Sequence, residues 1–501
     1  MYRVNSCYHA NKEIVSEKLT NSMEHQHKVF DVAILGAGLG GLIAATRLAK
    51  ENRSVLLLKE KRYRSSYSRD GYRFVPFSNF SEKLIQTNLP KKIPFPADHR
   101  ESKKGGDKPK QEVSFQVILP EARIDLYGER SLLQREWRRE FPEELNQIEN
   151  FYAELERIKQ VLKEIRSKAP PGPHFPIWNR SFLKRWLSFD GLPKGGTDQW
   201  LSPFSPEFKK FIELQMISHG NLRADSFPIP LVSHLLLDGE GDEWEESVDL
   251  EKVTEGMIEK FTQSGGKVEE IESVEKVEMK WREGVSVFLK GGKPTYRSRS
   301  LVLNSPLHSL LGLFGKKGKA LSRWGKKVRP RYVLVPFFLG IHEKVIPVGM
   351  RDRLVSLYDL QKPYEGGNLL FLRLSRKGDK NQAPEGKRAL TVQSLMSCGG
   401  LQKDSISDLQ DGVMNHLKHL FPFLENHIEF IDRKWADDQM DCWSYPHFLY
   451  EVDSDFRWRR GIVPIRISKN LYFSGRENFP YLGLEGEMIS GWLVGEEISG
   501  R

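Results

Sequence analysis

A chain of 501 residues is long enough for about two to four domains, and its 39% hydrophobic and 29% charged residues are typical of a globular protein rather than a disordered or fibrous one. The formal net charge of +10 permits attraction to nucleic acid or anionic lipid. However, lysines and arginines are spread along the whole chain and match no nucleic-acid-binding module. We therefore interpret the charge as general surface character and expect no nucleic-acid partner, with an anionic membrane surface as the main alternative.

The ends and the cysteines of the chain indicate its compartment. Residues 1–28 lack the apolar core of a signal peptide and are expected to form a disordered extension. No apolar run approaches the roughly 20 residues that span a bilayer. The three cysteines, which show no CxxC spacing and fit neither a disulfide framework nor a zinc site, are Cys7, Cys398 and Cys442. These features predict a cytoplasmic protein that is soluble or at most peripheral on a membrane.

The most informative segment is a glycine-rich turn near the start. Apolar runs at residues 31–35 and 55–58 predict buried strands, and the apolar spacing of residues 39–50 predicts a helix, so a parallel βαβ unit is favoured. The turn after the first strand has the pattern GxGxxG, formed by Gly36, Gly38 and Gly41. Its glycines permit a tight turn, close approach of the backbone to a pyrophosphate, and close packing of the helix on the strand. In this setting the motif predicts dinucleotide binding at a helix N-terminus, and the alternative is a turn used only for packing.

A dinucleotide site of this kind also binds a ribose hydroxyl through a carboxylate at the end of the second strand. Glu60 follows Gly36 at close to the roughly 20 residues expected, so it is our candidate. Side chains alternate faces along a strand, and Lys59 holds the preceding position, so Glu60 reaches the ribose only if the strand ends one residue early. In the alternative Glu60 is a solvated charge and backbone contacts hold the cofactor. As a further alternative, the basic residues Lys59, Lys61 and Arg62 would favour an adenosine 2′-phosphate, and hence NADP.

The rest of the chain alternates between helical and strand-rich segments. Residues 113–119 alternate like a half-buried strand, and residues 141–165 carry an apolar stripe at helical spacing. Residues 299–306 form another apolar run of strand length, residues 331–396 are β-rich, and residues 406–420 are expected to be helical. We detect no internal repeat.

Five segments occur in the order found in flavoprotein desaturases. They are "DVAILGAGLGGLIAATRLAKENRSVLLLKEK", "DGYRFVPF", "GGKVEEIESVEKV", "LVLNSP" and "NLYFSGRENFPYLGLEGEMISGW". From about Phe30 to its end, the chain resembles the phytoene desaturase and carotenoid isomerase family within the amine-oxidase-like FAD superfamily. The resemblance implies an α/β fold, in which a Rossmann-like FAD-binding domain of the GR2 type carries an inserted α+β substrate domain.

The resemblance also implies how the chain divides. The FAD-binding domain would be assembled from three separate segments, residues 29–85, 246–310 and 461–501. A mostly helical cap insertion would occupy residues 86–245. A substrate domain, β-rich and then helical, would occupy residues 311–460.

Positions carried over from the family's motifs give the expected cofactor contacts. The resemblance implies that the first turn faces the pyrophosphate through Gly36, Ala37, Gly38, Gly40 and Gly41. It implies that the backbone of Val274 meets the adenine. It also implies that the C-terminal motif lies along the ribityl chain and the pyrimidine, through Gly475, Gly486 and Met488. The alternative for this last motif is an ordinary glycine-bearing turn and helix.

Three departures from the family pattern remove close backbone approach or add bulk. Residues 61–69 contain no glycine where the family carries GG-R, residues 249–257 replace a GG-M motif, and Arg476 follows Gly475. We interpret Arg476 as a surface or structural residue, and the alternative is a partner for a phosphate or a reduced flavin. These departures keep open a degenerate member that binds a nucleotide or lipid without redox turnover.

Other polar and aromatic clusters carry weaker signals. His416 and His419 lie three apart on an expected helix without an acid-bearing metal motif, so we interpret them as a solvated face and expect no metal site. No Ser-His-Asp or GxSxG signature occurs, and no catalytic residue is predicted. Residues 175–189 mix aromatic and basic side chains, which favours packing inside the second domain, with an interfacial membrane segment as the alternative.

The resemblance implies a function as well as a fold. It implies an FAD-dependent oxidoreductase that takes hydride from an apolar isoprenoid-like substrate, or isomerises its double bonds through reduced flavin, as in carotenoid biosynthesis. Electrons would pass to oxygen or a quinone. The alternatives are an amine oxidase, a protoporphyrinogen oxidase-like enzyme, or the non-catalytic member. The sequence gives no oligomeric state.

Overall fold

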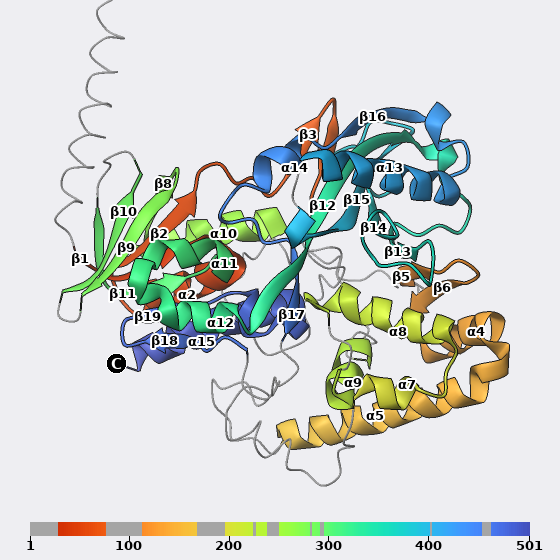
Figure 1. Ribbon diagram of the computed structural model, residues 1–501, viewed down its shortest axis with the longest axis horizontal. Coiled ribbons are helices and arrows are strands. Elements are labelled where there is room, and N and C mark those ends of the chain that lie inside the picture. The colour runs from red at the N-terminus through yellow and green to blue at the C-terminus, as the bar shows by residue number, and fades with distance from the viewer. Residues whose placement is uncertain are drawn as a thin grey trace, which may run out of the picture.

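The computed structural model describes residues 29–76, 113–167, 196–223, 227–237, 250–280, 283–290, 295–400, 403–452 and 462–500. Two β-sheets organise these residues and lie side by side, each with helices packed against it (Figure 1). A third group, made of helices alone, lies below the second sheet in that view. This arrangement is the mixed α/β architecture that the sequence predicts.

The first sheet has the strand order β18-β19-β11-β1-β2-β8, and β9 and β10 extend it beside β11. Its strands are β1 (Val29–Leu35), β2 (Val55–Glu60), β8 (Lys267–Ile271), β9 (Val274–Lys280), β10 (Gly284–Leu289), β11 (Tyr296–Leu303), β18 (Arg466–Ser468) and β19 (Leu471–Phe473). The strands from β19 to β8 are parallel, so their carboxyl ends meet at one edge. The strands β1 and β2 are almost fully buried, as their unbroken apolar runs predict.

The helix α2 (Leu39–Lys50) connects β1 to β2 and has the bounds that the sequence predicts. It packs against α10 (Leu250–Gln263) and α15 (Gly483–Ser499). A Cβ atom at Gly491 would lie 2.1 Å from the carbonyl oxygen of Gly40, so the crossing of α2 and α15 requires a glycine there. This close crossing places the C-terminal segment beside the first turn of the fold.

The second sheet has the order β6-β5-β13-β14-β15-β12-β17-β7, and β16 pairs with β12. Its strands are β5 (Val113–Ile118), β6 (Arg123–Tyr127), β7 (Leu222–Arg223), β12 (Val328–His342), β13 (Arg353–Leu357), β14 (Leu369–Leu374), β15 (Lys387–Ser397), β16 (Ile428–Asp432) and β17 (Phe448–Val452). The long strand β12 runs from beside the first sheet into the second (Figure 1). A separate hairpin is formed by β3 (Tyr67–Arg69) and β4 (Tyr72–Phe74).

The remaining helices belong to three places in Figure 1. The all-helical group contains α4 (Arg130–Glu140), α5 (Leu145–Ser167), α7 (Thr197–Leu201), α8 (Pro206–His219) and α9 (Ile229–Leu237). Beside the first sheet lie α11 (Leu307–Leu310) and α12 (Lys319–Gly325), and on the second sheet lie α13 (Lys403–Leu420) and α14 (Lys434–Gln439). The predicted apolar stripe of α5 is confirmed, since its described members are buried: Ile148, Phe151, Tyr152, Leu155 and Ile158.

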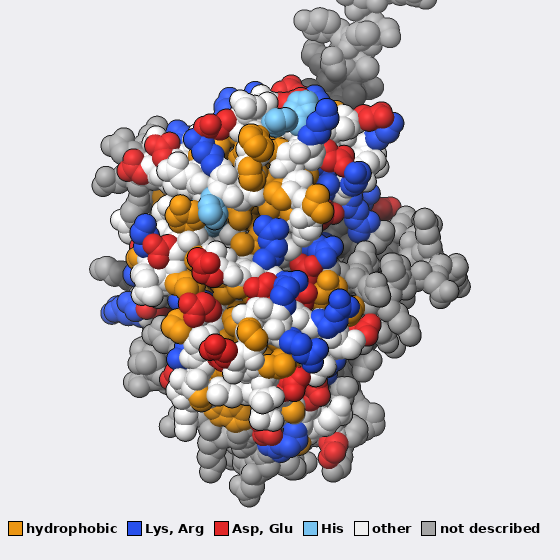
Figure 2. Space-filling model, turned by 90° about the vertical axis from the view of Figure 1, so that its right-hand side faces the viewer, with side chains coloured by type: hydrophobic (Ala, Val, Ile, Leu, Met, Phe, Trp, Pro, Cys, Tyr) orange, Lys and Arg blue, Asp and Glu red, His pale blue; other side chains and the backbone are white. Residues whose placement is uncertain are grey.

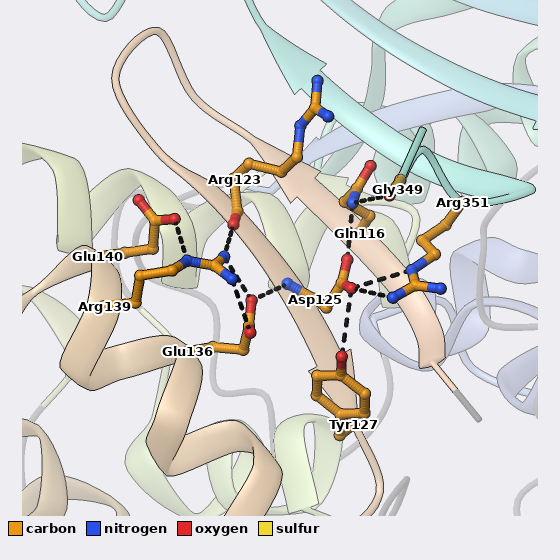
Figure 3. Close-up of polar contacts among 9 residues, drawn as sticks. All are labelled: Gln116, Arg123, Asp125, Tyr127, Glu136, Arg139, Glu140, Gly349 and Arg351. Carbon is orange, nitrogen blue, oxygen red and sulfur yellow. Dashed lines mark hydrogen bonds and ion pairs between the residues drawn. The ribbon is translucent and has the colours of Figure 1, made fainter. Parts of the chain in front are cut away.

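A polar network ties the edge strands of the second sheet to their surroundings (Figure 3). The carboxylate of Asp125 on β6 accepts hydrogen bonds from Gln116 at 2.7 Å and from Arg351 Nε at 2.9 Å. The backbone N–H of Asp125 donates to Glu136 on α4, whose carboxylate also pairs with Arg139. Asp125 therefore joins β5, β6, α4 and the segment before β13.

Replacing Asp125 with alanine is expected to lower the free energy of unfolding by about 2 kcal/mol, because Gln116 and Arg351 both lose a hydrogen-bond acceptor. The urea midpoint of the variant, compared with the parent protein, measures this cost. A matched control is Glu283→Ala, which removes one partner of the exposed Lys280–Glu283 pair and should cost no more than about 0.5 kcal/mol. Equal losses in the two variants would contradict the role of the network.

The charged side chains on the surface show the spread that the sequence indicates. Basic and acidic side chains are interspersed on the face that Figure 2 shows. In the described part of the chain, no helix combines the length and the apolar character that crossing a bilayer requires. The aromatic and basic segment 175–189 lies outside the described residues.

Candidate functional site

A cavity of about 380 Å³ lies at the carboxyl edge of the first sheet. Because β2 lies on one side of β1 and β11 on the other, this edge is the switch point at which open α/β sheets bind their ligands. The volume is within the range of roughly 300–1,000 Å³ that small-molecule sites occupy. The walls come from the glycine turn, the end of β2 with the residues that follow, α10, the residues after β11, and segments near residues 446 and 476.

The glycine turn has the geometry that the motif predicts. Gly36 has a φ of +110°, a conformation that other residues rarely adopt. A Cβ atom there would lie 2.2 Å from the carbonyl oxygen of Asn304. The helix α2 begins directly after Gly38, which as a glycine has no side chain to cap it. Its first N–H groups and the positive end of its dipole therefore face the cavity, which suits an anion.

The structure brings part of the predicted set of cofactor residues to the cavity. The members that line it are Ala37, Gly38, Glu60 and Gly475. Gly40 and Gly41 support the turn from behind, since Cβ atoms there would lie 2.6 Å from Ser474 Oγ and 2.4 Å from Asn304 Oδ1. These residues therefore lie in or directly behind the cavity wall. Their contacts with a cofactor stay predictions.

Three predicted residues lie away from the cavity lining. Val274 is the first residue of β9 and is buried. Gly486 and Met488 lie inside α15, where a Cβ atom at Gly486 would approach the carbonyl oxygen of Phe479 to 2.4 Å. Packing of the helix therefore accounts for Gly486 without a cofactor. The contacts expected from Val274, Gly486 and Met488 stay predictions.

Glu60 reaches the cavity in a way that the sequence did not predict. The strand β2 extends through Glu60, which pairs with Ile271 on β8, so the strand does not end early, the condition under which Glu60 was to reach the ribose. The carboxylate is buried and accepts hydrogen bonds from the backbone N–H groups of Trp443 and Ser444, at 3.3 and 2.8 Å. Burial raises the pKa of Glu60, although these hydrogen bonds oppose the shift. Each oxygen keeps a lone pair, so a ribose hydroxyl can still donate to it.

The basic residues beside Glu60 have other partners. Lys59 Nζ lies 3.1 Å from a carboxylate oxygen of Glu270, and Lys61 Nζ lies 3.1 Å from Glu272. Both acids belong to the end of β8 and the turn after it. The NADP alternative therefore gains no support from the two lysines.

The departures from the family pattern form part of the cavity wall. After β2, the residues that line the cavity are Tyr63, Arg64 and Ser65. The backbone N–H of Arg64 donates to Gln439 at 2.6 Å, and Ser66 Oγ donates to Glu251 on α10 at 2.6 Å. The helix α10, which replaces the family's GG-M, contributes Glu251, Thr254, Glu255 and Ile258. The residues that replace the family's glycine motifs therefore place side chains in the cavity wall, as the sequence indicates.

A buried ion pair lies at the glycine turn. Arg476 Nε is 3.0 Å from Glu487 Oε2, and both side chains are 8% exposed. The other oxygen, Glu487 Oε1, accepts a hydrogen bond from the backbone N–H of Gly40 at 3.3 Å. Arg476 is therefore a buried residue, and the interpretation as a surface residue is wrong. Sequence reasoning missed Glu487, although it stands next to two positions of the C-terminal motif.

Two further titratable groups lie in the cavity wall. Glu477 is 2% exposed, and its Oε1 accepts a hydrogen bond from the backbone N–H of Leu307 at 2.7 Å. Burial raises the pKa of Glu477 to about 7. Burial lowers the pKa of His447 to about 3, and the Arg476 charge adds to this effect. At neutral pH the cavity thus holds a neutral imidazole and a carboxyl group that can exchange a proton, neither of which the sequence analysis singled out.

Several buried polar atoms in the wall have no hydrogen-bond partner among the described residues. They are Asn304 Oδ1, Ser305 Oγ and both ring nitrogens of His447. Buried polar groups are usually paired, so this cluster indicates a site made for a polar ligand. Together with the N-terminus of α2 and Glu60, these atoms fit a nucleotide-bearing cofactor.

A second cavity, of about 310 Å³, lies between the second sheet and α13. His416 in its wall is 2% exposed, with Nδ1 2.9 Å from the carbonyl oxygen of Gly367 and Nε2 2.8 Å from Ser356 Oγ. Burial lowers the pKa of His416 to about 4. The predicted solvated face is therefore wrong for His416, because this side of α13 packs on the sheet, whereas His419 is exposed. The described residues contain no cluster of acidic, histidine and cysteine side chains that could hold a metal ion.

Comparison with known sequences agrees with this geometry. Residues 34–75 match the family described as NAD(P)-binding Rossmann-like domain. The chain is 23% identical to the chloroplastic prolycopene isomerase of Arabidopsis thaliana over 444 residues, which cover 80% of this chain and 71% of that protein. It is 24% identical to the chloroplastic prolycopene isomerase of Daucus carota over 470 residues, which cover 85% of this chain and 72% of that protein.

Comparison with solved structures gives the fold. A double mutant of putrescine oxidase superposes with a TM-score of 0.59 at 14% identity, over 94% of this chain and 99% of that chain. The predicted fold class, a Rossmann-like domain with a second domain inserted, is confirmed by this likeness and by the domain match. The predicted resemblance is confirmed by the isomerases.

Proposed function

We propose that this chain, which is similar to prolycopene isomerases in sequence and to putrescine oxidase in fold, is a flavin-dependent oxidoreductase of the phytoene desaturase and carotenoid isomerase type. It binds FAD and acts on an apolar, isoprenoid-like substrate by hydride transfer between a substrate carbon and the flavin. The observation that carries the proposal is the switch-point cavity, whose walls join the glycine turn of the first sheet to residues 444–450 at the start of β17 in the second sheet.

The residues of the cavity have distinct roles in this proposal. The amides of the glycine turn and the start of α2 hold the diphosphate, and Glu60 accepts a ribose hydroxyl. The flavin accepts or donates the hydride when it is bound. Glu477 and His447 lie where they can hold or accept a proton that accompanies this transfer.

An apolar substrate suits the other wall residues. The cavity lining includes the aliphatic side chains and prolines of Val75, Pro76, Ile258, Pro306, Pro446 and Leu484. The relatives of known name are prolycopene isomerases, which supports a polyene as the substrate class. A substrate that dissolves in a bilayer would bring the protein to a membrane surface, which sedimentation with phospholipid vesicles would detect.

Purified protein is expected to carry FAD, or to take it up when FAD is added, and to show the visible absorption of an oxidised flavin. The glycine turn and the buried polar atoms around it give the physical reason, because they supply donors and acceptors for the nucleotide. Absorption spectroscopy after gel filtration measures the binding. Colourless protein that takes up no FAD would contradict the proposal.

The substrate is tested separately from the cofactor. Protein loaded with FAD is incubated with prolycopene under reducing, anaerobic conditions, and with phytoene in the presence of a quinone. A shift to the all-trans isomer, or new conjugated double bonds, supports an isoprenoid substrate. Turnover of putrescine or a porphyrinogen instead would assign one of the alternative activities. Bound flavin that responds to none of these substrates would favour the non-catalytic alternative.

A further inference from the structure

We propose that Glu487 is an internal competitor of the cofactor diphosphate, and that Arg476 binds that diphosphate when Glu487 is displaced. The inference rests on the proposed function in one respect, namely that the ligand of the glycine turn carries phosphate. It adds a mechanism that sets the affinity of the protein for its cofactor. It also assigns phosphate binding to Arg476 in the C-terminal segment.

The position of the Glu487 carboxylate is the first observation. Its Oε1 accepts a hydrogen bond from the Gly40 amide in the first turn of α2, at 3.3 Å. A Cβ atom added to Gly38 would lie only 2.7 Å from the same oxygen. The carboxylate thus lies against the turn where backbone amides and the helix dipole favour an anion. A diphosphate and this carboxylate cannot both occupy the turn.

The second observation is the charge that holds Glu487 in place. The Arg476 guanidinium is buried beside Glu487, and its Nη1 donates a weak hydrogen bond to the carbonyl oxygen of Pro446 at 3.4 Å. A buried guanidinium needs an anion next to it. If Glu487 moves away, a bound diphosphate can supply that negative charge, and guanidinium groups bind phosphate oxygens well.

The third observation is that the turn carries acceptors and donors that Glu487 does not use. Asn304 Oδ1 and Ser305 Oγ are buried beside the turn without a partner among the described residues. A Cβ atom at Gly38 would lie 2.8 Å from Asn304 Oδ1. Ser305 Oγ can donate to a phosphate oxygen, whereas Asn304 Oδ1 can only accept, so it suits a hydroxyl group elsewhere on the same ligand. If the Arg476–Glu487 ion pair served only to hold α15 against α2, the unpaired Asn304 Oδ1 and Ser305 Oγ would have no explanation.

The test measures binding of ADP, FAD and adenosine to the full chain by calorimetry. Glu487→Gln is expected to bind ADP and FAD roughly 10- to 100-fold more tightly, because a like charge next to the diphosphate is removed. Adenosine, which has no phosphate, should bind the variant and the parent equally. Arg476→Gln should weaken ADP binding with little effect on adenosine, and Arg476→Lys should recover part of the loss.

The matched control is Glu485→Gln on the same helix. Glu485 is buried and does not line the cavity, and its Oε2 lies 3.6 Å from Nε2 of His234 on α9. Its replacement should leave ADP affinity unchanged. Circular dichroism and the unfolding temperature establish that each variant is folded.

The outcomes separate this inference from the proposed function. If the parent protein binds FAD and ADP but Glu487→Gln binds them no more tightly, competition by Glu487 is wrong and the flavin assignment stands. If Glu487→Gln raises the affinity for adenosine as much as the affinity for ADP, the effect is steric or conformational. The inference is then also overturned. If the parent and all folded variants bind neither FAD nor ADP, both the proposed function and this inference fail.

Discussion

Replacing Gly36 with alanine is expected to lower the free energy of unfolding by roughly 3–5 kcal/mol and to abolish dinucleotide binding. Two costs add. The φ of +110° is strained for any residue with a side chain, and the new Cβ atom would lie 2.2 Å from the carbonyl oxygen of Asn304. The carbonyl belongs to the backbone, so it cannot move aside without shifting the end of β11. Urea unfolding and titration with ADP measure the two effects.

A control separates the strain from the collision. Gly265 has a φ of +84°, but a Cβ atom there would meet nothing within 4 Å. Gly265→Ala should therefore cost only about 1–2 kcal/mol and leave ADP binding intact. If Gly36→Ala is no worse than Gly265→Ala, the tight packing of the turn against Asn304 is not what makes glycine necessary.

The second large effect is a dependence of stability on pH that originates at Glu477. Burial raises the pKa of this carboxyl group to about 7, from an ordinary value of 4.5. Between these pH values the folded protein keeps a proton that the unfolded chain has lost. The contribution of Glu477 to stability is therefore fully present below pH 4.5 and is lost as the pH rises through 7. The loss amounts to about 3 kcal/mol at most.

Glu477→Gln is expected to remove this dependence. The amide has nearly the same shape, stays neutral, and its oxygen can accept the hydrogen bond from the Leu307 amide. The variant should match the parent in acid and exceed it by up to about 3 kcal/mol above pH 8. Urea midpoints of both proteins from pH 4.5 to 8.5 give the difference. A difference that is constant with pH would show that Glu477 does not titrate in this range.

The local part of the fold was predictable because it depends on neighbours in the sequence. The helix Leu39–Lys50 follows from apolar spacing, and the turn at Gly36 follows from steric limits on the backbone. The apolar stripe of α5 identified its buried face in the same way. In each case the residues that decide the structure lie within a few turns of one another.

The site was less predictable because its partners lie far apart in the chain. Glu60 is held by the amides of residues 443 and 444, and Glu477 is buried against Leu307. The burial of Glu487 depends on a helix crossing that glycine at 491 permits. His416 was misjudged for the same reason, since nothing in its own helix shows that Ser356 lies opposite. The spacing of residues in the sequence predicts one helix or strand at a time. It does not predict contacts between residues that are far apart in the chain.

The crossing of α2 and α15 has a consequence for the order of events during synthesis. The first strand and the glycine turn leave the ribosome early, but the wall that faces them comes from residues 475–487. A nascent chain that stops before Gly491 has the nucleotide turn without the helix that packs on it. Cofactor loading should thus follow translation of α15, and a growing chain would hold an exposed apolar surface on α2 until then.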